Sequence, residues 1–200
     1  MIALAQALME RCWEAGAVVV QNAPITLKSG RQSHVYVSLR HFVCESANLA
    51  LCGDVFGEWL EGRELTLGSV SSLLSPVLCG AFAGRFDLPL ALFRADASEK
   101  GLSGQVFGGE KGGAVVLVDD VLSSGGTAVE AARAFAEKGL GKASLFVFVD
   151  KRPQSLRVHF PLPVAAPLNL GELLRHGIKA GYLRGEALGF AEKELAFLAD

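Results

Sequence analysis

The stretch AVVLVDDVLSSGGTA, residues 114–128, constrains the fold of this chain more than any other part of the sequence. Its first five residues are apolar, and four of them are branched aliphatics, which is typical of a strand buried on both faces. Two adjacent carboxylates, Asp119 and Asp120, follow where this strand is expected to end. A turn of small residues then leads into a helix near Ala128. This order of elements predicts one crossover unit of a parallel sheet, with its polar residues at the carboxyl edge.

The turn at residues 123–127 has the composition of a phosphate-binding loop. Backbone N–H groups can surround a phosphate there, glycines allow close approach, and the dipole of the following helix favours an anion. The dipole contributes only about 0.3–1 kcal/mol, so several donors must share the binding. A nucleotide P-loop is excluded because Thr127, not lysine, follows Gly126, and a partial GxGxxG at 139–144 has Ser144 in place of its third glycine. We expect a site for a phosphorylated sugar. The alternative is a plain strand–turn–helix unit with a solvated acidic pair.

Composition and charge argue against several classes of protein. The chain has 200 residues, 50% of them apolar, and a formal net charge of −2, which argues against disorder and against electrostatic binding of nucleic acid. Despite a mean hydropathy of +0.35, no run of about eighteen apolar residues predicts a membrane span. The N-terminus lacks the basic region of a signal peptide, and the four cysteines form no CxxC pair. We therefore expect a cytoplasmic protein with buried free thiols.

Strands that alternate with helices predict one α/β domain with a mostly parallel central sheet flanked by helices. Strands are expected at 65–68, 88–93, 114–118, 143–150 and 163–168. Helices are expected at 2–15, 48–61, 77–86, 128–138, 170–176 and 185–200. Within this single domain of residues 1–200 we distinguish an N-terminal hood segment on the substrate side (1–40), a core (41–180) and a C-terminal helix (181–200).

The stretch 114–128 resembles the 5-phosphoribosyl-1-pyrophosphate (PRPP) signature of type I phosphoribosyltransferases. The resemblance implies the fold of that family, with Asp119 and Asp120 contacting the ribose hydroxyls and the Mg²⁺-linked region, and the loop holding the 5-phosphate. Mg²⁺ is expected with PRPP, near the acidic pair and without direct protein ligands. The implied PRPP-binding residues are Asp119, Asp120, Val121, Leu122, Ser123, Ser124, Gly125, Gly126 and Thr127, together with Ser71 and Ser72.

A second segment, ITLKSGRQSHVYVS at residues 25–38, places a basic turn before an alternating strand in which Val35 and Val37 share one face. On physical grounds alone it is an edge hairpin with solvated cations. It resembles the amino-terminal substrate segment of orotate phosphoribosyltransferases, and the matching residues are Leu27, Lys28, Ser29, Gly30, Arg31, Ser33 and Tyr36. The resemblance implies that Lys28 approaches the pyrophosphate or orotate and that Tyr36 flanks the base, with Thr127 as a further substrate contact.

Two segments depart from the pattern of this family. Lys151 stands where the family has an arginine that contacts orotate, and Arg152 is adjacent. A shift of one residue would make Arg152 the substrate contact, and a pair of simple surface cations is the alternative. Segment 68–76 lacks the family's proline, second glycine and lysine, which leaves Ser71 and Ser72 as hydrogen-bond donors or an ordinary serine-rich turn.

The glycine-rich segment 94–109 resembles the mobile catalytic loop of the family. Arg94 matches, but Ala95 and Ser98 replace two lysines, and Lys100 falls near the position of the usual histidine. Negative charge grows on the pyrophosphate as it leaves, so cations placed over it lower the barrier. Losing one preorganised donor at such a site costs on the order of 10²–10³ in rate. Activity therefore depends on whether other cations replace the missing lysines.

The resemblance as a whole implies a homodimeric orotate phosphoribosyltransferase, a pentosyltransferase of pyrimidine nucleotide biosynthesis that makes orotidine 5′-monophosphate from orotate and PRPP with Mg²⁺. Its catalytic residues would be Asp119, Asp120, Arg94 and Lys100. Two alternatives stay open. One is a regulatory relative that binds PRPP or a nucleotide with impaired catalysis, and the other is a phosphoribosyltransferase for a different base.

Overall fold

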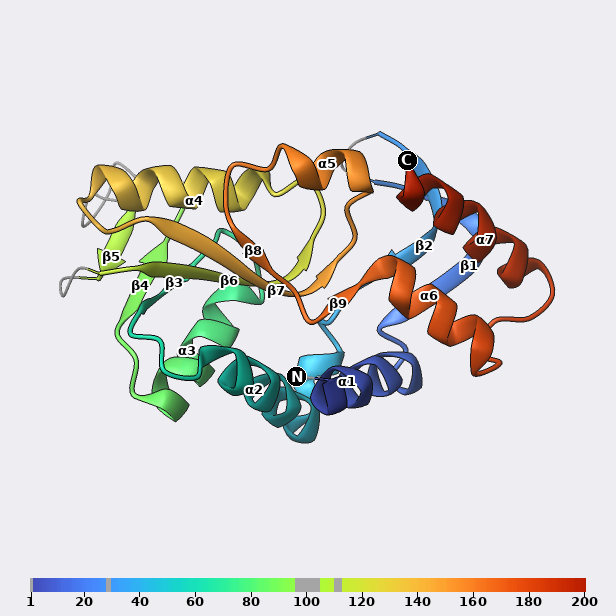
Figure 1. The fold of residues 1–200 in the computed structure, drawn as a ribbon, viewed down its shortest axis with the longest axis horizontal. Helices are drawn as coiled ribbons and strands as arrows, with labels where there is room; N and C mark the ends of the chain where they lie inside the picture. Colours follow the sequence, from blue (N-terminus) through green and yellow to red (C-terminus); the bar gives the residue numbers. More distant parts are fainter. Residues whose placement is uncertain (1, 28–29, 96–104, 110–112) are drawn as a thin grey trace.

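A twisted sheet runs through the centre of the computed structural model, which describes residues 2–27, 30–95, 105–109 and 113–200 (Figure 1). Its strand order is β5 (Val106–Gly108), β4 (Leu90–Phe93), β3 (Thr66–Ser69), β6 (Val115–Leu122), β7 (Ala143–Asp150) and β8 (Val164–Ala165), and β9 (Leu168–Asn169) also pairs with β7. All these pairs are parallel except that of β4 with β5 at the edge. The predicted, mostly parallel sheet is confirmed.

Helices cover both faces of this sheet (Figure 1). The helices α1 (Ile2–Glu14), α2 (Ser46–Leu60) and α3 (Ser75–Phe86) lie on one side, with the short 3₁₀ helix η1 (Phe42–Cys44), and α4 (Gly126–Glu137) and α5 (Gln154–Val158) lie on the other. Strand β6 serves both layers, because Val116 and Val118 belong to one apolar core, and Val115 and Leu117 belong to the other. Successive side chains of a strand point to opposite faces. A strand covered on both faces therefore needs the uninterrupted apolar run seen in the sequence.

A separate antiparallel hairpin, β1 (Val18–Thr26) and β2 (Gln32–Val37), stands beside the sheet. Val35 and Val37 are both buried, which confirms that they share one face. The helices α6 (Leu170–Lys179) and α7 (Glu186–Ala199) complete this side of the molecule, and α7 lies directly against the hairpin (Figure 1). The C-terminal segment thus packs on the N-terminal one. The division of the chain at residues 40 and 180 stays a prediction.

The structure differs from the expected elements in several places. Strand β6 does not end before the acidic pair, because its pairing with β7 continues as far as Leu122 opposite Asp150. The single strand expected at 163–168 is divided into β8 and β9 around Pro167, a residue that cannot donate to a strand ladder. Strand β5 and helix α5 were not expected from the sequence, and the first strand of the expected hairpin, β1, begins at Val18, earlier than the segment 25–38 indicated.

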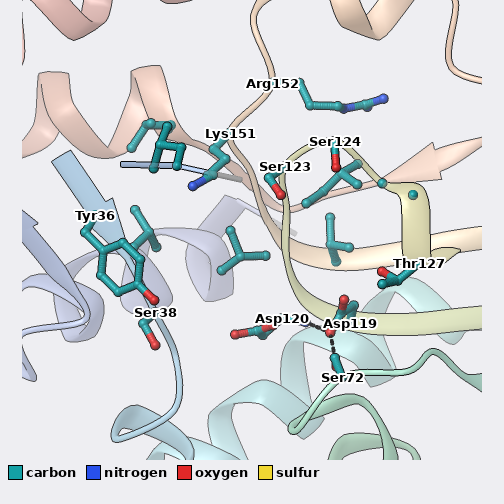
Figure 2. Close-up of a pocket in the computed structure, with 18 of the residues that line it drawn as sticks. Tyr36, Ser38, Ser72, Asp119, Asp120, Ser123, Ser124, Thr127, Lys151 and Arg152 are labelled. Atoms are coloured by element: carbon teal, nitrogen blue, oxygen red, sulfur yellow. Dashed lines mark hydrogen bonds between the residues drawn. The ribbon is translucent and has the colours of Figure 1, made fainter. Parts of the chain in front are cut away.

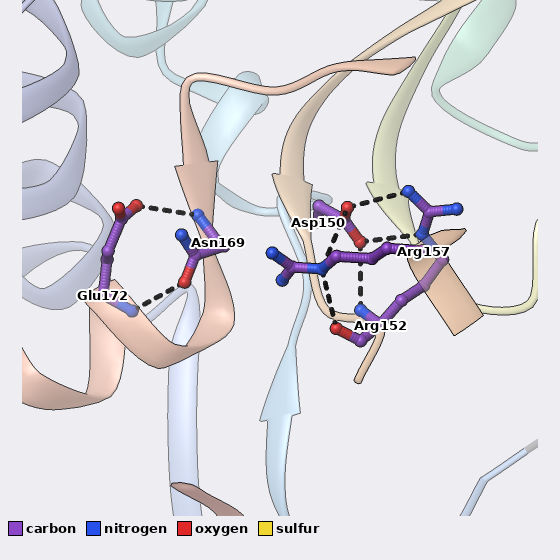
Figure 3. Close-up of polar contacts among 5 residues, drawn as sticks. All are labelled: Asp150, Arg152, Arg157, Asn169 and Glu172. Carbon is purple, nitrogen blue, oxygen red and sulfur yellow. Dashed lines mark hydrogen bonds and ion pairs between the residues drawn. The ribbon is translucent and has the colours of Figure 1, made fainter. Parts of the chain in front are cut away.

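Other local expectations are confirmed. Asn169 caps α6 in a capping box, with its side chain accepting from the Glu172 N–H (2.9 Å) and the Glu172 carboxylate accepting from the Asn169 N–H (3.2 Å; Figure 3). The cysteines are free thiols, and they are buried with the exception of Cys44, which is exposed. Among the described residues, no helix combines the length and the apolar character needed to cross a membrane.

Candidate functional site

The carboxyl ends of β3, β6 and β7 open into a cavity of about 660 Å³ (Figure 2). The loops that follow β3 and β6 form one wall, and the β1–β2 hairpin and α7 form the other. Ligands of open parallel sheets bind at this edge, which is where the sequence analysis placed the site. The cavity is lined by these residues predicted from the sequence: Tyr36, Ser71, Ser72, Asp119, Asp120, Arg152 and all of 121–127.

The acidic pair lies inside the end of β6. Asp119 accepts hydrogen bonds from the Ser72 hydroxyl (2.8 Å) and from the backbone N–H of Asp120 (3.0 Å). Ser72 itself accepts from the N–H of Ser75 at the start of α3 (3.1 Å), so this serine connects the loop after β3 to the acidic pair. Burial, and then the neighbouring Asp120 carboxylate, raise the pKa of Asp119 to about 7, although the two hydrogen bonds act in the opposite direction.

The two side chains of the acidic pair point in different directions. Figure 2 shows the two carboxylates diverging, with Asp119 directed at Ser72 and Asp120 directed into the pocket on the side of Ser38. Alternation along the strand explains this divergence, because successive side chains point to opposite faces. Within the part of the chain that the structure describes, no group of three or more His, Cys, Asp or Glu side chains is arranged to hold a metal ion.

The loop after β6 is built to receive an anion. Gly125 is the N-cap of α4 in the left-handed conformation (φ +75°), and a Cβ on it would lie 2.4 Å from the ring of Phe160. Only glycine meets both conditions without strain. No side chain caps α4. The N–H groups of Ala128 and Val129 donate to the Gly125 carbonyl, so those of Gly126 and Thr127 at the start of the helix are the ones available to a ligand. Ser123, Ser124 and Thr127 surround the same loop (Figure 2).

Arg152 lines the cavity, but its guanidinium is held elsewhere. Its side chain is 4% exposed and donates to both carboxylate oxygens of Asp150, from Nε at 3.0 Å and from Nη2 at 2.9 Å (Figure 3). The ring of Phe160 covers the guanidinium at 4.5 Å. The expected alternative of a surface cation is wrong for Arg152. Among the described residues its Nη1 has no hydrogen-bond partner, and its contact with a substrate stays a prediction.

The side chain of the neighbouring residue, Lys151, points away from that of Arg152. Figure 2 shows its side chain directed into the pocket toward Tyr36. Burial lowers the pKa of Lys151, and Arg31 lowers it further, whereas the carboxylates of Glu194 and Asp120 raise it. A half-buried cation whose charge is sensitive to its neighbours therefore points into the cavity, and its backbone N–H donates to the carbonyl of Leu122 (3.0 Å) at the start of the phosphate loop.

Not every predicted residue belongs to this cavity. Arg94 is exposed at the end of β4, its guanidinium lies 5.7 Å from the centre of the Phe107 ring, and it is not among the residues that line the cavity. Lys28 and Lys100 lie outside the described residues. Other lining residues went unassigned in the sequence analysis, and they include Ser38, Arg40, Glu194 and Phe197. The last two belong to α7, whose sequence pattern indicated packing alone.

Comparison with known proteins gives this site a family context. Residues 74–161 match the model of the phosphoribosyl transferase domain. The chain is 32% identical to an orotate phosphoribosyltransferase of Xanthomonas euvesicatoria over 190 residues, which are 86% of this chain and 85% of that protein. It is 30% identical to an orotate phosphoribosyltransferase of Archaeoglobus fulgidus over 152 residues, which are 76% of this chain and 84% of the relative.

Solved structures share the fold. An orotate phosphoribosyltransferase from Aeropyrum pernix superposes with a TM-score of 0.70 at 24% identity, covering 90% of this chain and 98% of that structure. A UMP synthase of Leishmania donovani superposes with a TM-score of 0.78 at 24% identity over 95% of this chain. The match spans only 42% of the Leishmania protein, so the present chain corresponds to less than half of that longer molecule.

Proposed function

The chain belongs to the orotate phosphoribosyltransferase family, and from this premise we propose that it transfers the 5-phosphoribosyl group of PRPP to orotate, giving orotidine 5′-monophosphate and pyrophosphate. One observation carries the proposal. A single cavity brings together an uncapped, glycine-bearing helix N-terminus, an acidic pair, a half-buried lysine and an aromatic residue, Tyr36. A phosphorylated sugar and an anionic ring require these two chemically different sets of groups.

The phosphate loop and the acidic pair divide the binding of PRPP. The N–H groups and hydroxyls of 123–127 receive the 5-phosphate, since an anion is favoured at a helix N-terminus. The carboxylates of Asp119 and Asp120 accept hydrogen bonds from the ribose hydroxyls, and these bonds favour the charged form of Asp119. Together these groups hold the sugar with its C1 toward the base side of the cavity, where Lys151 and Tyr36 receive orotate.

Mg²⁺ is part of this proposal as an ion that enters with PRPP. Burial and the neighbouring Asp120 carboxylate raise the pKa of Asp119, and a cation beside the pair would favour its charged form. One or two carboxylates beside substrate phosphates are a usual environment for Mg²⁺. The acidic pair therefore fits such an ion, whereas the described residues do not form a cage for it. When bound, Mg²⁺ would neutralise charge on the pyrophosphate group.

The leaving pyrophosphate also needs protein cations. Arg94, Lys100 and Lys28 are the proposed groups, in the roles that the family resemblance implies. Of these, Arg94 is the first residue after β4, and the other two lie outside the described residues. Each donor aligned with the developing charge is worth on the order of 10²–10³ in rate.

The test is consumption of orotate in the presence of PRPP and Mg²⁺, followed at the absorbance band of orotate. We expect turnover by the wild type and its loss in Asp120→Asn, because that substitution removes a charge that faces the ribose. Glu130→Gln, on the exposed face of α4, is the matched control and should keep full activity. Unchanged turnover in Asp120→Asn would refute the assigned site.

A regulatory protein that binds PRPP without catalysis is the second candidate, and the replacement of two loop lysines by Ala95 and Ser98 favours it. Calorimetry would then detect PRPP binding in a protein without turnover. The third candidate is a phosphoribosyltransferase for another base, which the presence of Lys151 in place of the family arginine favours. A panel of bases in the same assay separates it from the leading proposal.

We further propose that the protein is a cytoplasmic homodimer. Leu73 and Val77, beside the cavity loop and on the first turn of α3, have 70% and 50% of their surfaces exposed, and apolar residues exposed together are typical of interfaces. Sedimentation equilibrium checks the dimer. Replacing Leu73 by aspartate should shift the population toward the monomer.

A further inference from the structure

We propose that Glu194, on α7, is a positioning residue that fixes the base-side wall of the cavity and thereby sets the affinity for the base but not for PRPP. The inference rests on the proposed function, since it names the part of the chain that shapes the orotate end of that same site. Glu194 acts through the hairpin residues that it holds.

Glu194 is bound by two residues of the hairpin. Its side chain is 6% exposed, and its carboxylate accepts from Arg31 Nη1 (3.0 Å), from Arg31 Nη2 (2.5 Å) and from the hydroxyl of Ser33 (3.0 Å). A bidentate pair of this kind fixes the plane of the guanidinium as well as its distance. A buried carboxylate is costly unless it is paired, so the three residues stay together as one unit.

The same helix also contacts a face of the guanidinium, whose edge is bound by Glu194. Phe197 lies one turn after Glu194, and its ring centre is 3.8 Å from the Arg31 guanidinium carbon. Residues three apart share one face of a helix, so a single face of α7 supplies both the carboxylate and the ring. A lysine would not reproduce these contacts, because it lacks the planar fork.

This arrangement explains two motif residues that the proposed chemistry leaves without a role. Arg31 and Ser33 belong to the sequence motif of the hairpin, yet both face Glu194 instead of the phosphate loop. The backbone of Arg31 closes the hairpin turn by accepting from the N–H of Leu27 (2.9 Å). Contacts that fix the position of Arg31 therefore also restrain the turn that carries the remaining motif residues.

The unit formed by Glu194, Arg31 and Phe197 lines the cavity together with Lys151. The charged groups that act on Lys151 come from three elements: Arg31 of the hairpin, Glu194 of α7 and Asp120 of β6. Without the charge of Glu194, no carboxylate of α7 would oppose the effect of the Arg31 charge on Lys151. The pKa of Lys151 would therefore fall. Affinity for an anionic base would then be lost at a lower pH than in the wild type.

Other contacts keep α7 in place when Glu194 is altered. The His34 imidazole of the hairpin stacks on Phe190 of α7, with ring centres 3.8 Å apart and planes inclined by 3°. Ala191, the residue after Phe190, is fully buried in the apolar core. A substitution of Glu194 should therefore loosen the guanidinium and the turn while leaving the helix docked.

The experiment compares Glu194→Gln with the wild type and with Glu192→Gln, an exposed glutamate on the same helix. We measure KM for orotate and for PRPP across pH, and the Kd of orotidine 5′-monophosphate and of PRPP by calorimetry. Glu194→Gln should raise the orotate KM and the nucleotide Kd by about tenfold, the factor that one charge-assisted hydrogen bond is worth, and should leave the PRPP values unchanged. Glu192→Gln should leave all four values unchanged.

An equal rise in the values for both substrates, or no rise in either, would overturn the positioning role. If Glu194→Gln does not fold, Ser33→Ala replaces it. This variant removes the hydroxyl that donates to Glu194 and accepts from the Val35 N–H, and it leaves the ion pair of Glu194 with Arg31 in place. It should raise the orotate KM alone, and an unchanged orotate KM would overturn the inference. Absence of turnover in the wild type would instead refute the proposed function, and the nucleotide Kd of the variants would still decide the role of Glu194.

Discussion

Replacing Asp119 by asparagine should stabilise the ligand-free protein while it weakens the binding of PRPP. The substitution removes a charge that burial and Asp120 both disfavour. It keeps the geometry, because the amide oxygen of asparagine can still accept from the Ser72 hydroxyl and from the N–H of Asp120. A binding site that is strained without its ligand should respond in this way.

The magnitude follows from the pKa of Asp119, which burial raises from 3.8 to about 7. Each pH unit between these values corresponds to about 1.4 kcal/mol, so the full difference is about 4 kcal/mol at most. Between these two values the folded chain keeps a proton that the unfolded chain has released. Rising pH therefore favours unfolding, and the stabilisation present below pH 3.8 is lost as the pH rises through about 7.

The assay is urea unfolding of the wild type and of Asp119→Asn, without PRPP or Mg²⁺, at several pH values that span this range. The free energy of unfolding of the variant should exceed that of the wild type by an amount that grows with pH and becomes constant above about pH 7. Glu130→Gln should follow the wild type at every pH. A difference between Asp119→Asn and the wild type that does not change with pH would refute the reasoning.

Two further substitutions test the loops beside the acidic pair. Arg152→Met should cost about 3–5 kcal/mol of stability, because it leaves the buried carboxylate of Asp150 without its bidentate partner, and thermal unfolding measures this loss. The binding free energy of orotate should change far less than the free energy of unfolding. A large loss of orotate binding in a variant of unchanged stability would contradict a role of Arg152 in stability alone. Gly125→Ala should weaken PRPP binding in calorimetry, because the left-handed backbone and the ring of Phe160 leave no room for a methyl group. Unchanged PRPP affinity would contradict that loop geometry.

Local patterns in the sequence predicted the fold well where one strand or helix decides the outcome. The apolar run of β6 predicted burial on both faces, and its residues alternate between the two cores as this requires. The end of β6 could not be predicted in the same way. Strand pairing continues through Asp119 opposite Val147 because β7 is long enough to provide partners, and this depends on a different part of the chain.

The sequence motif did not decide which of the adjacent cations, Lys151 or Arg152, points into the pocket. Residues two apart in an extended chain point to the same side, so Asp150 and Arg152 can pair while Lys151 points to the opposite side. The structure has this arrangement, with Arg152 bound to Asp150 and Lys151 in the pocket. Family resemblance alone could not decide between neighbouring cations, whereas the alternation of side chains favours Lys151.

Glu194 had no signal in the sequence, because its partners lie more than 160 residues away at Arg31 and Ser33. An amphipathic C-terminal helix predicts packing, and only the folded chain shows that one of its carboxylates faces the cavity. The same holds for the contact of Ser72 with Asp119, which joins two loops from different strands. Local patterns thus indicated the residues that we assign to the phosphate, whereas the residues that we assign to the base depend on contacts between the N-terminal and C-terminal segments.

The distribution of charge within the cavity also bears on how substrates are divided between its ends. Among the described residues, the cations that line it are Arg31, Arg40, Lys151 and Arg152. Arg31 and Arg152 are each held by a carboxylate, so their charges are largely compensated. In the proposed function, Lys151 is therefore the principal described cation left for an anionic base, and exposed Arg40 and Mg²⁺ would serve the pyrophosphate. We infer that such a protein would recognise the base through an internally paired wall and the pyrophosphate through groups that assemble with the substrate.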